Sequence, residues 1–243
     1  MKRIVRSVVR RLMTIIDRDY EDRYNFLRSF SQHGEDLIVY RIFQMRNISN
    51  PSYLDIGANH PYSLSNTALF YLTGSRGINV EANSDLIERF KKSRPEDVNL
   101  NIGVASKVGQ CDFFIMQDRL LSTTSKSEVD QLNSFGKRVA EKVTIPTTTV
   151  ENIVNNYARG RFPDFLSIDI EGMDLEVLKS IDYSRTCPKV ICVESVDYSL
   201  TGAGTKRMEV VNFLTSKGYI EVAFTNLNSI MVLKSFWLNE QAY

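Results

Sequence analysis

The sequence predicts a doubly wound α/β fold built on one mostly parallel sheet. Short apolar runs that end near an acid or a glycine alternate along the chain with segments of helical periodicity, an order typical of parallel sheets covered by helices on both faces. The clearest apolar runs are residues 53–57 and 165–169. The last two runs, residues 219–224 and 230–234, are separated by a short Asn-rich turn, which predicts an antiparallel hairpin at the C-terminal edge of the sheet.

The composition is that of a globular protein with a single core. The chain has 243 residues, of which 43% are hydrophobic and 24% charged, enough for one α/β domain. A net charge of +1 offers no argument for a nucleic-acid partner. Three cysteines without metal-type spacing suit a reducing compartment, so we expect a cytoplasmic protein. The sequence has no apolar run long enough to span a bilayer, and we expect no signal peptide, because an uninterrupted apolar region does not follow the basic start.

Residues 1–30 are predicted to form an N-terminal helical arm, and residues 31–243 the main domain. Within residues 1–18, six Lys and Arg side chains stand against one acid, Asp17, and apolar residues recur between them at helical spacing. Such a basic amphipathic helix suits peripheral contact with the inner face of a membrane. It equally suits packing on its own domain or on a second subunit of a homo-oligomer, and both interpretations stay open.

The elements of the main domain follow in order. A helix is expected to begin at Ser31 as its N-cap, with Glu35 and Asp36 in the first turn, where the helix dipole favours acids. The later helices are expected over residues 64–72, 85–92, 150–157, 173–180 and 205–217. Besides the runs already named, strands are expected over residues 77–81, 98–105, 143–149 and 189–194, with a small hairpin-like addition at 111–116.

Residues 118–142, here called the lid segment, are polar and rich in Ser and Thr. A connection of this length inside a compact domain is usually functional or mobile. We expect the lid segment to bind the acceptor substrate, and a disordered surface insertion is the alternative.

Two strand ends predict a nucleoside site. Asp55 and Gly57 close the first strand, and ligands of open α/β sheets bind at such carboxyl ends. Gly57 is expected to let the backbone approach the ligand, because a Cβ there would collide with it. Glu81, roughly twenty residues beyond the turn, is placed to bind two ribose hydroxyls.

Asn59 and Pro61 stand where a dinucleotide fingerprint has further glycines, which leaves a pyrophosphate without a cradle. A ligand with ribose and adenine but no phosphate fits better, and S-adenosylmethionine is the common one.

Five stretches of the chain, in order, resemble the FkbM-type family of S-adenosylmethionine-dependent methyltransferases. They are residues 31–36, 55–59, 78–81, 101–104 and 164–172. The resemblance implies a seven-stranded class I methyltransferase fold of the Rossmann-like kind and O-methylation, often of a sugar or natural-product hydroxyl. We therefore expect an O-methyltransferase that acts on a small molecule, above all a saccharide or glycan precursor of polysaccharide biosynthesis.

The resemblance also implies roles for single residues. Residues 55–59 would surround the methionine part, Glu81 would bind the ribose, Ala82 would flank it, and Gly103 and Val104 would lie near the adenine. The polar cluster at residues 31–36 either caps its helix or covers the amino-acid end of the cofactor. The expected cofactor contacts are Gln32, Asp55, Gly57, Ala58, Asn59, Glu81, Ala82, Gly103 and Val104. Pro61 departs from the family pattern, because many methyltransferases end the first loop with glycine there.

A hydroxyl acceptor benefits from a base, and three residues are candidates by placement: Asp169, Glu171 and His60. Alternation along a strand puts Asp169 and Glu171 on one face at the carboxyl end. Glu171 could instead cap the next helix, and His60 could be a hydrogen-bonded loop residue. Asp169, Glu194 and His60 would suit Mg or Mn, although their spacing does not demand a divalent metal.

Two other classes of function are weighed against a methyltransferase. A metal-dependent hydrolase could use the same acids but would leave Glu81 without a role. A non-catalytic module could bind S-adenosylmethionine without turnover. Cofactor binding separates the first alternative from a methyltransferase, and turnover separates the second.

Overall fold

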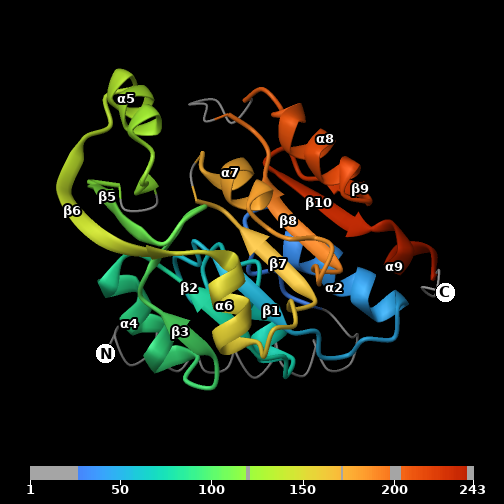
Figure 1. Ribbon diagram of the computed structural model, residues 1–243. Helices are drawn as coiled ribbons and strands as arrows, with labels where there is room; N and C mark the ends of the chain where they lie inside the picture. The colour runs from blue at the N-terminus through green and yellow to red at the C-terminus, as the bar shows by residue number, and fades with distance from the viewer. Residues whose placement is uncertain (1–26, 119–120, 171, 198–203, 240–243) are drawn as a thin grey trace, which may run out of the picture.

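The protein, seen here in a computed structural model that describes residues 27–118, 121–170, 172–197 and 204–239, is organised around a seven-stranded sheet (Figure 1). The strand order is β3-β2-β1-β7-β8-β10-β9. Its strands are β1 (Tyr53–Ile56), β2 (Gly77–Val80), β3 (Val98–Leu100), β7 (Phe165–Ile168), β8 (Val190–Glu194), β9 (Tyr219–Phe224) and β10 (Asn228–Leu233). All pairs are parallel except those of β10, which runs antiparallel to β8 and β9. The predicted doubly wound sheet with its C-terminal hairpin is confirmed.

Helices cover both faces of this sheet. They are α2 (Glu35–Met45), α3 (Ala68–Leu72), α4 (Ser84–Ser93), α6 (Val150–Tyr157), α7 (Asp174–Lys179), α8 (Met208–Ser216) and α9 (Lys234–Leu238). Strand alternation explains the two layers. Tyr53 packs in one core with Phe43 of α2 and Phe70 of α3, whereas Leu54 packs in a second core with Val177 of α7. The central strands are therefore apolar on both faces, as parallel strands between helical layers must be.

A smaller sheet stands beside the main one (Figure 1). It contains β4 (Gly103–Val104), β6 (Val139–Thr148) and β5 (Gly109–Met116), in that order. The single strand predicted over residues 98–105 is therefore wrong, since β3 pairs with β2 and β4 pairs with β6. Asn101 causes the break: its Nδ2 donates to the carbonyl oxygens of Glu81 and Ala82, both at 2.9 Å, and turns the chain out of the main sheet.

The lid segment has structure of its own. It contains helix α5 (Lys126–Ser134), and the chain then enters β6 at Val139, four residues earlier than predicted. Ser125 caps α5, because its Oγ accepts the N–H of Glu128 at 3.3 Å. In the other direction, the N–H and the C=O of Thr123 both pair with Phe114 of β5. The lid segment is thus tied to the smaller sheet at both of its ends.

The start of α2 differs from the prediction. The helix begins at Glu35 with Gly34 as its N-cap, and Gly34 has a φ of 90°. Ser31 lies one turn earlier, where its Oγ accepts the N–H of Gly34 at 3.1 Å and donates to Oδ1 of Asp36 at 2.8 Å. The helix predicted over residues 64–72 is also shorter, since only Ala68–Leu72 is helical, and α9 was not predicted.

Two sequence-based expectations concern residues 1–26 and Glu171, which lie outside the described residues. The arm over residues 1–30 therefore stays a prediction. Among the helices that the structure describes, none combines the length and the apolar character needed to cross a membrane. The thiols of Cys111, Cys187 and Cys192 are all free.

Candidate active site

A cavity of about 480 Å³ opens at the carboxyl ends of β1, β2, β7 and β8. Its volume lies within the roughly 300–1,000 Å³ usual for small-molecule sites. All nine predicted cofactor contacts line it: Gln32, Asp55, Gly57, Ala58, Asn59, Glu81, Ala82, Gly103 and Val104. Asp169 lines it as well, whereas His60 is not among its lining residues.

Gly57 shapes the floor of the cavity. It has a φ of 75°, and the N–H groups of Gly57 and Ala58 both donate to the carbonyl of Val80. A Cβ on Gly57 would stand 1.9 Å from the carbonyl oxygen of Asp169. A side chain at position 57 would therefore strike the backbone after β7, a reason for glycine that was not predicted, and the expected close approach of a ligand stays a prediction.

Asp55 lies on β1 with only 4% of its surface exposed. Its Oδ2 accepts the hydroxyl of Thr67 at 2.5 Å. Burial raises the pKa of Asp55, and the hydrogen bond from Thr67 and the positive charge of Arg94 oppose that rise. The structure thus places a buried carboxyl group, held by the hydrogen bond from Thr67, at the floor of the cavity.

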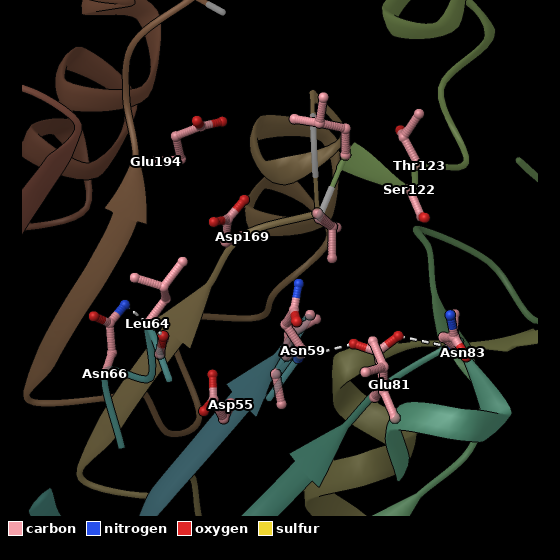
Figure 2. Close-up of a pocket in the computed structure, with 18 of the residues that line it drawn as sticks. Asp55, Asn59, Leu64, Asn66, Glu81, Asn83, Ser122, Thr123, Asp169 and Glu194 are labelled. Atoms are coloured by element: carbon pink, nitrogen blue, oxygen red, sulfur yellow. Dashed lines mark hydrogen bonds between the residues drawn. The ribbon is translucent and has the colours of Figure 1, made fainter. Parts of the chain in front are cut away.

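Glu81 stands at the end of β2 and is 7% exposed. Its Oε1 accepts the N–H of Asn83 at 2.7 Å and its Oε2 accepts the N–H of Asn59 at 2.9 Å (Figure 2). Burial raises the pKa of Glu81 and these two backbone hydrogen bonds oppose the rise. Each carboxylate oxygen keeps a lone pair that can accept a ligand hydroxyl.

The surroundings of Glu81 fit a nucleoside. Within the described chain, the buried Nδ2 of Asn83 has no hydrogen-bond partner, and Asn83 lines the cavity. An orphaned donor beside a carboxylate is the kind of group that a ribose or base can satisfy. Apolar wall residues continue from there, as a flat base requires: Ala82, Leu86, Ile102 and Val104. The residues present therefore fit S-adenosylmethionine.

Two carboxyl groups occupy the other side of the cavity. The pairing of β7 with β8 ends at Ile168 and Val193, which brings the next residues, Asp169 and Glu194, side by side. Figure 2 shows both across the cavity from Glu81. Burial and the neighbouring carboxylates, Asp169 first, raise the pKa of Glu194 to about 9 against the opposing charge of Arg207, whose Nη2 lies 3.1 Å from its Oε2.

His60 does not line the cavity, and its side chain hydrogen-bonds within its own loop. Its Nδ1 accepts the N–H of Tyr62 at 3.2 Å and the N–H of Ser63 at 3.0 Å, so the ring holds its own loop together. Burial lowers the pKa of His60, and the positive charge of Arg89 also lowers it, by a smaller amount. No cluster of three or more His, Cys, Asp or Glu able to hold a metal ion occurs among the residues described, so the trio of Asp169, Glu194 and His60 is not assembled.

The acids at the start of α2 hold the turn that reaches the cavity. Oε2 of Glu35 accepts the N–H of His33 at 2.8 Å, and its Oε1 accepts from the side chains of Thr225 and Asn228 at 2.6 and 3.0 Å. These acids therefore act structurally, and the turn that they fix brings Gln32 and His33 to the cavity wall.

The lid segment closes the upper side of the cavity. It contributes Asp118, Leu121, Ser122, Thr123, Thr124 and Lys137 to the lining. In Figure 2, Ser122 and Thr123 lie across the cavity from Asp169 and Glu194, on the same side as Glu81. Lys137 and Asp118 pair at 3.3 Å.

Sequence reasoning missed several lining residues. The predicted helix over residues 64–72 concealed Asn66, whose Nδ2 donates to Oγ of Ser167 at 3.2 Å. Asn226 was seen only as a turn residue, and Asp197 carried no signal of its own. Only its position could have indicated that Asp197 lines the cavity, since it follows the carboxyl end of β8 by three residues.

The strand order and the acid-ended β1 and β2 around one cavity define a class I S-adenosylmethionine-dependent methyltransferase. The sequence matches the Methyltransferase FkbM domain over residues 55–221, most of the chain. The protein belongs to the FkbM methyltransferase family, and S-adenosylmethionine is its methyl donor. The resemblance noted from the five stretches is confirmed.

Solved structures similar to this chain include the methyltransferase FkbM from Methylobacillus flagellatus KT, with 12% identity and a TM-score of 0.42 over 75% of this chain. The chain spans 43% of the length of that protein. A putative caffeoyl-CoA O-methyltransferase from Staphylococcus aureus has 12% identity and a TM-score of 0.45, covering 90% of each chain. An O-methyltransferase from Bacillus cereus in complex with SAH has 10% identity and a TM-score of 0.40, covering 88% of this chain and 87% of that one. Curated protein sequences give no match.

Proposed function

We propose that the protein is an O-methyltransferase that methylates a hydroxyl of a small-molecule acceptor, specifically a saccharide or glycan precursor. The observation that carries this proposal is the pair of carboxyl groups, Asp169 and Glu194, which lies in the cavity opposite Glu81. Carboxyl groups accept hydrogen bonds from hydroxyls, and the hydroxyls of Ser122 and Thr123 add donors and acceptors across the cavity from them. An acceptor with several hydroxyl groups could form hydrogen bonds with these side chains.

Different lining residues would hold the cofactor and the acceptor. Glu81 would accept the ribose hydroxyls, the loop of residues 57–59 would enclose the methionine part, and Asp55 would bind its ammonium group. When bound, S-adenosylmethionine supplies a methyl group already activated by its sulfonium. The space beside Asp169 and Glu194 is left for the acceptor.

Asp169 is the proposed base. Transfer from bound S-adenosylmethionine would break the S–CH3 bond, form an O–CH3 bond to the acceptor and leave S-adenosylhomocysteine, and the Asp169 carboxylate would take the hydroxyl proton. Alignment of acceptor and donor can supply about 7–11 kcal/mol of the barrier, and the base about 10²–10⁴-fold in rate. Glu171 stays a candidate from sequence because it lies outside the described residues, and His60 does not reach the cavity.

The first test is calorimetric titration of S-adenosylmethionine into the wild type and into Glu81→Gln and Glu81→Ala. We expect binding by the wild type, weakened in the variants by about 1.5–3 kcal/mol, because a hydrogen bond to a charged group is lost. Glu88→Gln is the matched control, since Glu88 is an exposed residue of α4 that pairs with Lys91. If the wild type fails to bind the cofactor, the proposed function is wrong.

A second test separates catalysis from binding. Asp169→Asn should bind S-adenosylmethionine as the wild type does but lose about 10²–10⁴-fold in turnover with a saccharide acceptor, because only the proton acceptor is removed. Turnover is measured as S-adenosylhomocysteine released. Unchanged turnover by Asp169→Asn would assign the base elsewhere, and cofactor binding without turnover of any hydroxyl acceptor would favour a non-catalytic module.

The basic arm suggests where the enzyme acts. We propose that residues 1–18 give a cytoplasmic protein peripheral contact with the membrane, which would allow a lipid-linked acceptor. Deleting residues 1–18 should abolish binding to anionic liposomes and leave cofactor affinity unchanged. Liposome binding that survives the deletion would contradict this proposal.

A further inference from the structure

Two side-chain relays converge on Asp55, and both begin with groups that can only donate. We propose that Thr67 and Ser167 are positioning residues that hold the Asp55 carboxylate in place to bind the cationic ammonium of the cofactor. This inference rests on the proposed function, because it presumes that S-adenosylmethionine occupies the cavity. Neither Thr67 nor Ser167 was among the residues that the sequence singled out.

The first relay starts at Arg94. Its Nη1 donates to Oγ1 of Thr67 at 3.1 Å, and that hydroxyl donates to Oδ2 of Asp55 at 2.5 Å. Because a guanidinium has no acceptor, the Thr67 hydrogen is left to point at Asp55 at 2.5 Å, which is much nearer than Oγ of Ser65 at 3.5 Å. Thr67 is fully buried, so its hydroxyl has no water to turn to. The direction of the relay is therefore set by chemistry.

The second relay starts at Asn66. Its Nδ2 donates to Oγ of Ser167 at 3.2 Å, and Ser167 lies beside Asp55 in the register of β7 with β1, where its hydroxyl lowers the pKa of Asp55. An amide nitrogen also only donates, so Ser167 is likewise left to donate to the carboxylate. Hydrogen bonds in such chains polarise one another and strengthen at low dielectric. Asp55, which lines the cavity, thus accepts the hydroxyl of Thr67 and has the hydroxyl of Ser167 as its neighbour on β7.

The charges around Asp55 explain why it needs these donors. Arg94 and Asp97 form a fully buried ion pair nearby, and Glu81 and Cys192 also interact with Asp55. Burial raises the pKa of Asp55, while the two hydroxyls and Arg94 lower it. Removing one hydroxyl should therefore raise that pKa further, and the anionic form should be lost at a higher pH as the solution is acidified.

A purely structural role predicts something different. If Thr67 only packs the core, its loss should weaken every ligand of the cavity alike and at every pH. If it positions Asp55, the loss should affect only a ligand that carries the ammonium group. The probes that separate the two roles are S-adenosylmethionine and 5′-methylthioadenosine, which keeps the nucleoside but lacks the amino-acid part.

The experiment titrates both probes into the full chain and its variants between pH 5.5 and 7.5. Thr67→Val removes the hydroxyl at constant size, and Thr67→Ser restores it. Thr147→Val is the matched control, because Thr147 is also buried, donates to the carbonyl of Lys107 at 3.3 Å and does not line the cavity.

We expect Thr67→Val to bind S-adenosylmethionine roughly 10-fold or more weakly at pH 7, the effect of losing a hydrogen bond to a charged group. The loss should grow as the pH falls, 5′-methylthioadenosine should be unaffected, and Thr67→Ser and Thr147→Val should bind both probes as the wild type does. Equal weakening of both probes, or no weakening by Thr67→Val, would overturn the inference.

Two further results keep the test decisive. If Thr67→Val does not fold, Ser167→Ala, which interrupts the second relay, takes its place. It should likewise weaken S-adenosylmethionine but not 5′-methylthioadenosine, and the loss should grow as the pH falls. Should the wild type bind neither probe, the proposed function itself fails. A wild type that binds both probes with variants that do not discriminate between them overturns only the role of the relays.

Discussion

Replacing Arg94 with methionine is expected to lower the free energy of unfolding by about 3–5 kcal/mol, because a buried charge would lose its partner. Arg94 and Asp97 have side chains that are 0% exposed, with Nε and Oδ2 2.9 Å apart. Arg94 also donates to the hydroxyl of Tyr53 at 2.8 Å. Urea denaturation followed by circular dichroism measures the effect.

Arg76→Met is the control, since Arg76 and Glu96 form an ion pair whose side chains are 41% and 59% exposed. Its loss should cost no more than about 1 kcal/mol. Adding Asp97→Asn to Arg94→Met should recover part of the lost stability, because the unpaired charge is then removed as well. Equal stability of Arg94→Met and Arg76→Met would show that the buried pair contributes nothing specific.

Gly57→Ala is expected to abolish binding of S-adenosylmethionine and to destabilise the domain. A residue other than glycine at a φ of 75° costs about 1–3 kcal/mol in strain. In addition, its Cβ would stand 1.9 Å from the carbonyl oxygen of Asp169, so the ends of β1 and β7 would have to separate. Calorimetric titration of the cofactor and thermal unfolding measure the two effects.

Gly218→Ala separates strain from collision. Gly218 has a φ of 88°, but a Cβ there meets nothing within 4 Å. This variant should therefore show only the strain of about 1–3 kcal/mol and full cofactor binding. If Gly57→Ala behaved like Gly218→Ala in both measurements, the close approach of the two strand ends would not be needed by the site.

Local signals predicted much of this fold. Helix α6 was predicted at its observed bounds, and the reason is local: Oγ1 of Thr149 caps it by accepting the N–H of Asn152. The strand ends of β1 and β7 were also predicted well, because apolar residues buried on both faces leave a contiguous pattern in the chain. The nine expected cofactor contacts follow from these strand ends and from the family resemblance, and all of them line the cavity.

The errors arose where hydrogen bonds between side chains and the backbone, distant for Asn101 and local for His60, decide the structure. Residues 98–105 look like one strand, but Asn101 binds two carbonyls about twenty residues earlier and divides them between two sheets. His60 was a candidate base by its position after the first loop, yet its Nδ1 is used by the backbone of its own turn. No sequence periodicity reports such side-chain contacts.

The sequence by itself determined how strands and helices alternate along the chain and which acids end β1 and β2. The reason is that apolar periodicity and helix caps depend on residues close together in the sequence. Only the tertiary structure decided what surrounds those acids. The hydroxyl of Thr67 reaches Asp55 from twelve residues away, and Arg94 reaches Thr67 from twenty-seven residues away. Likewise, Glu194 meets Asp169 because β8 lies beside β7. Burial and hydrogen bonding at such distances depend on how the elements pack, which gives each carboxyl group its own environment.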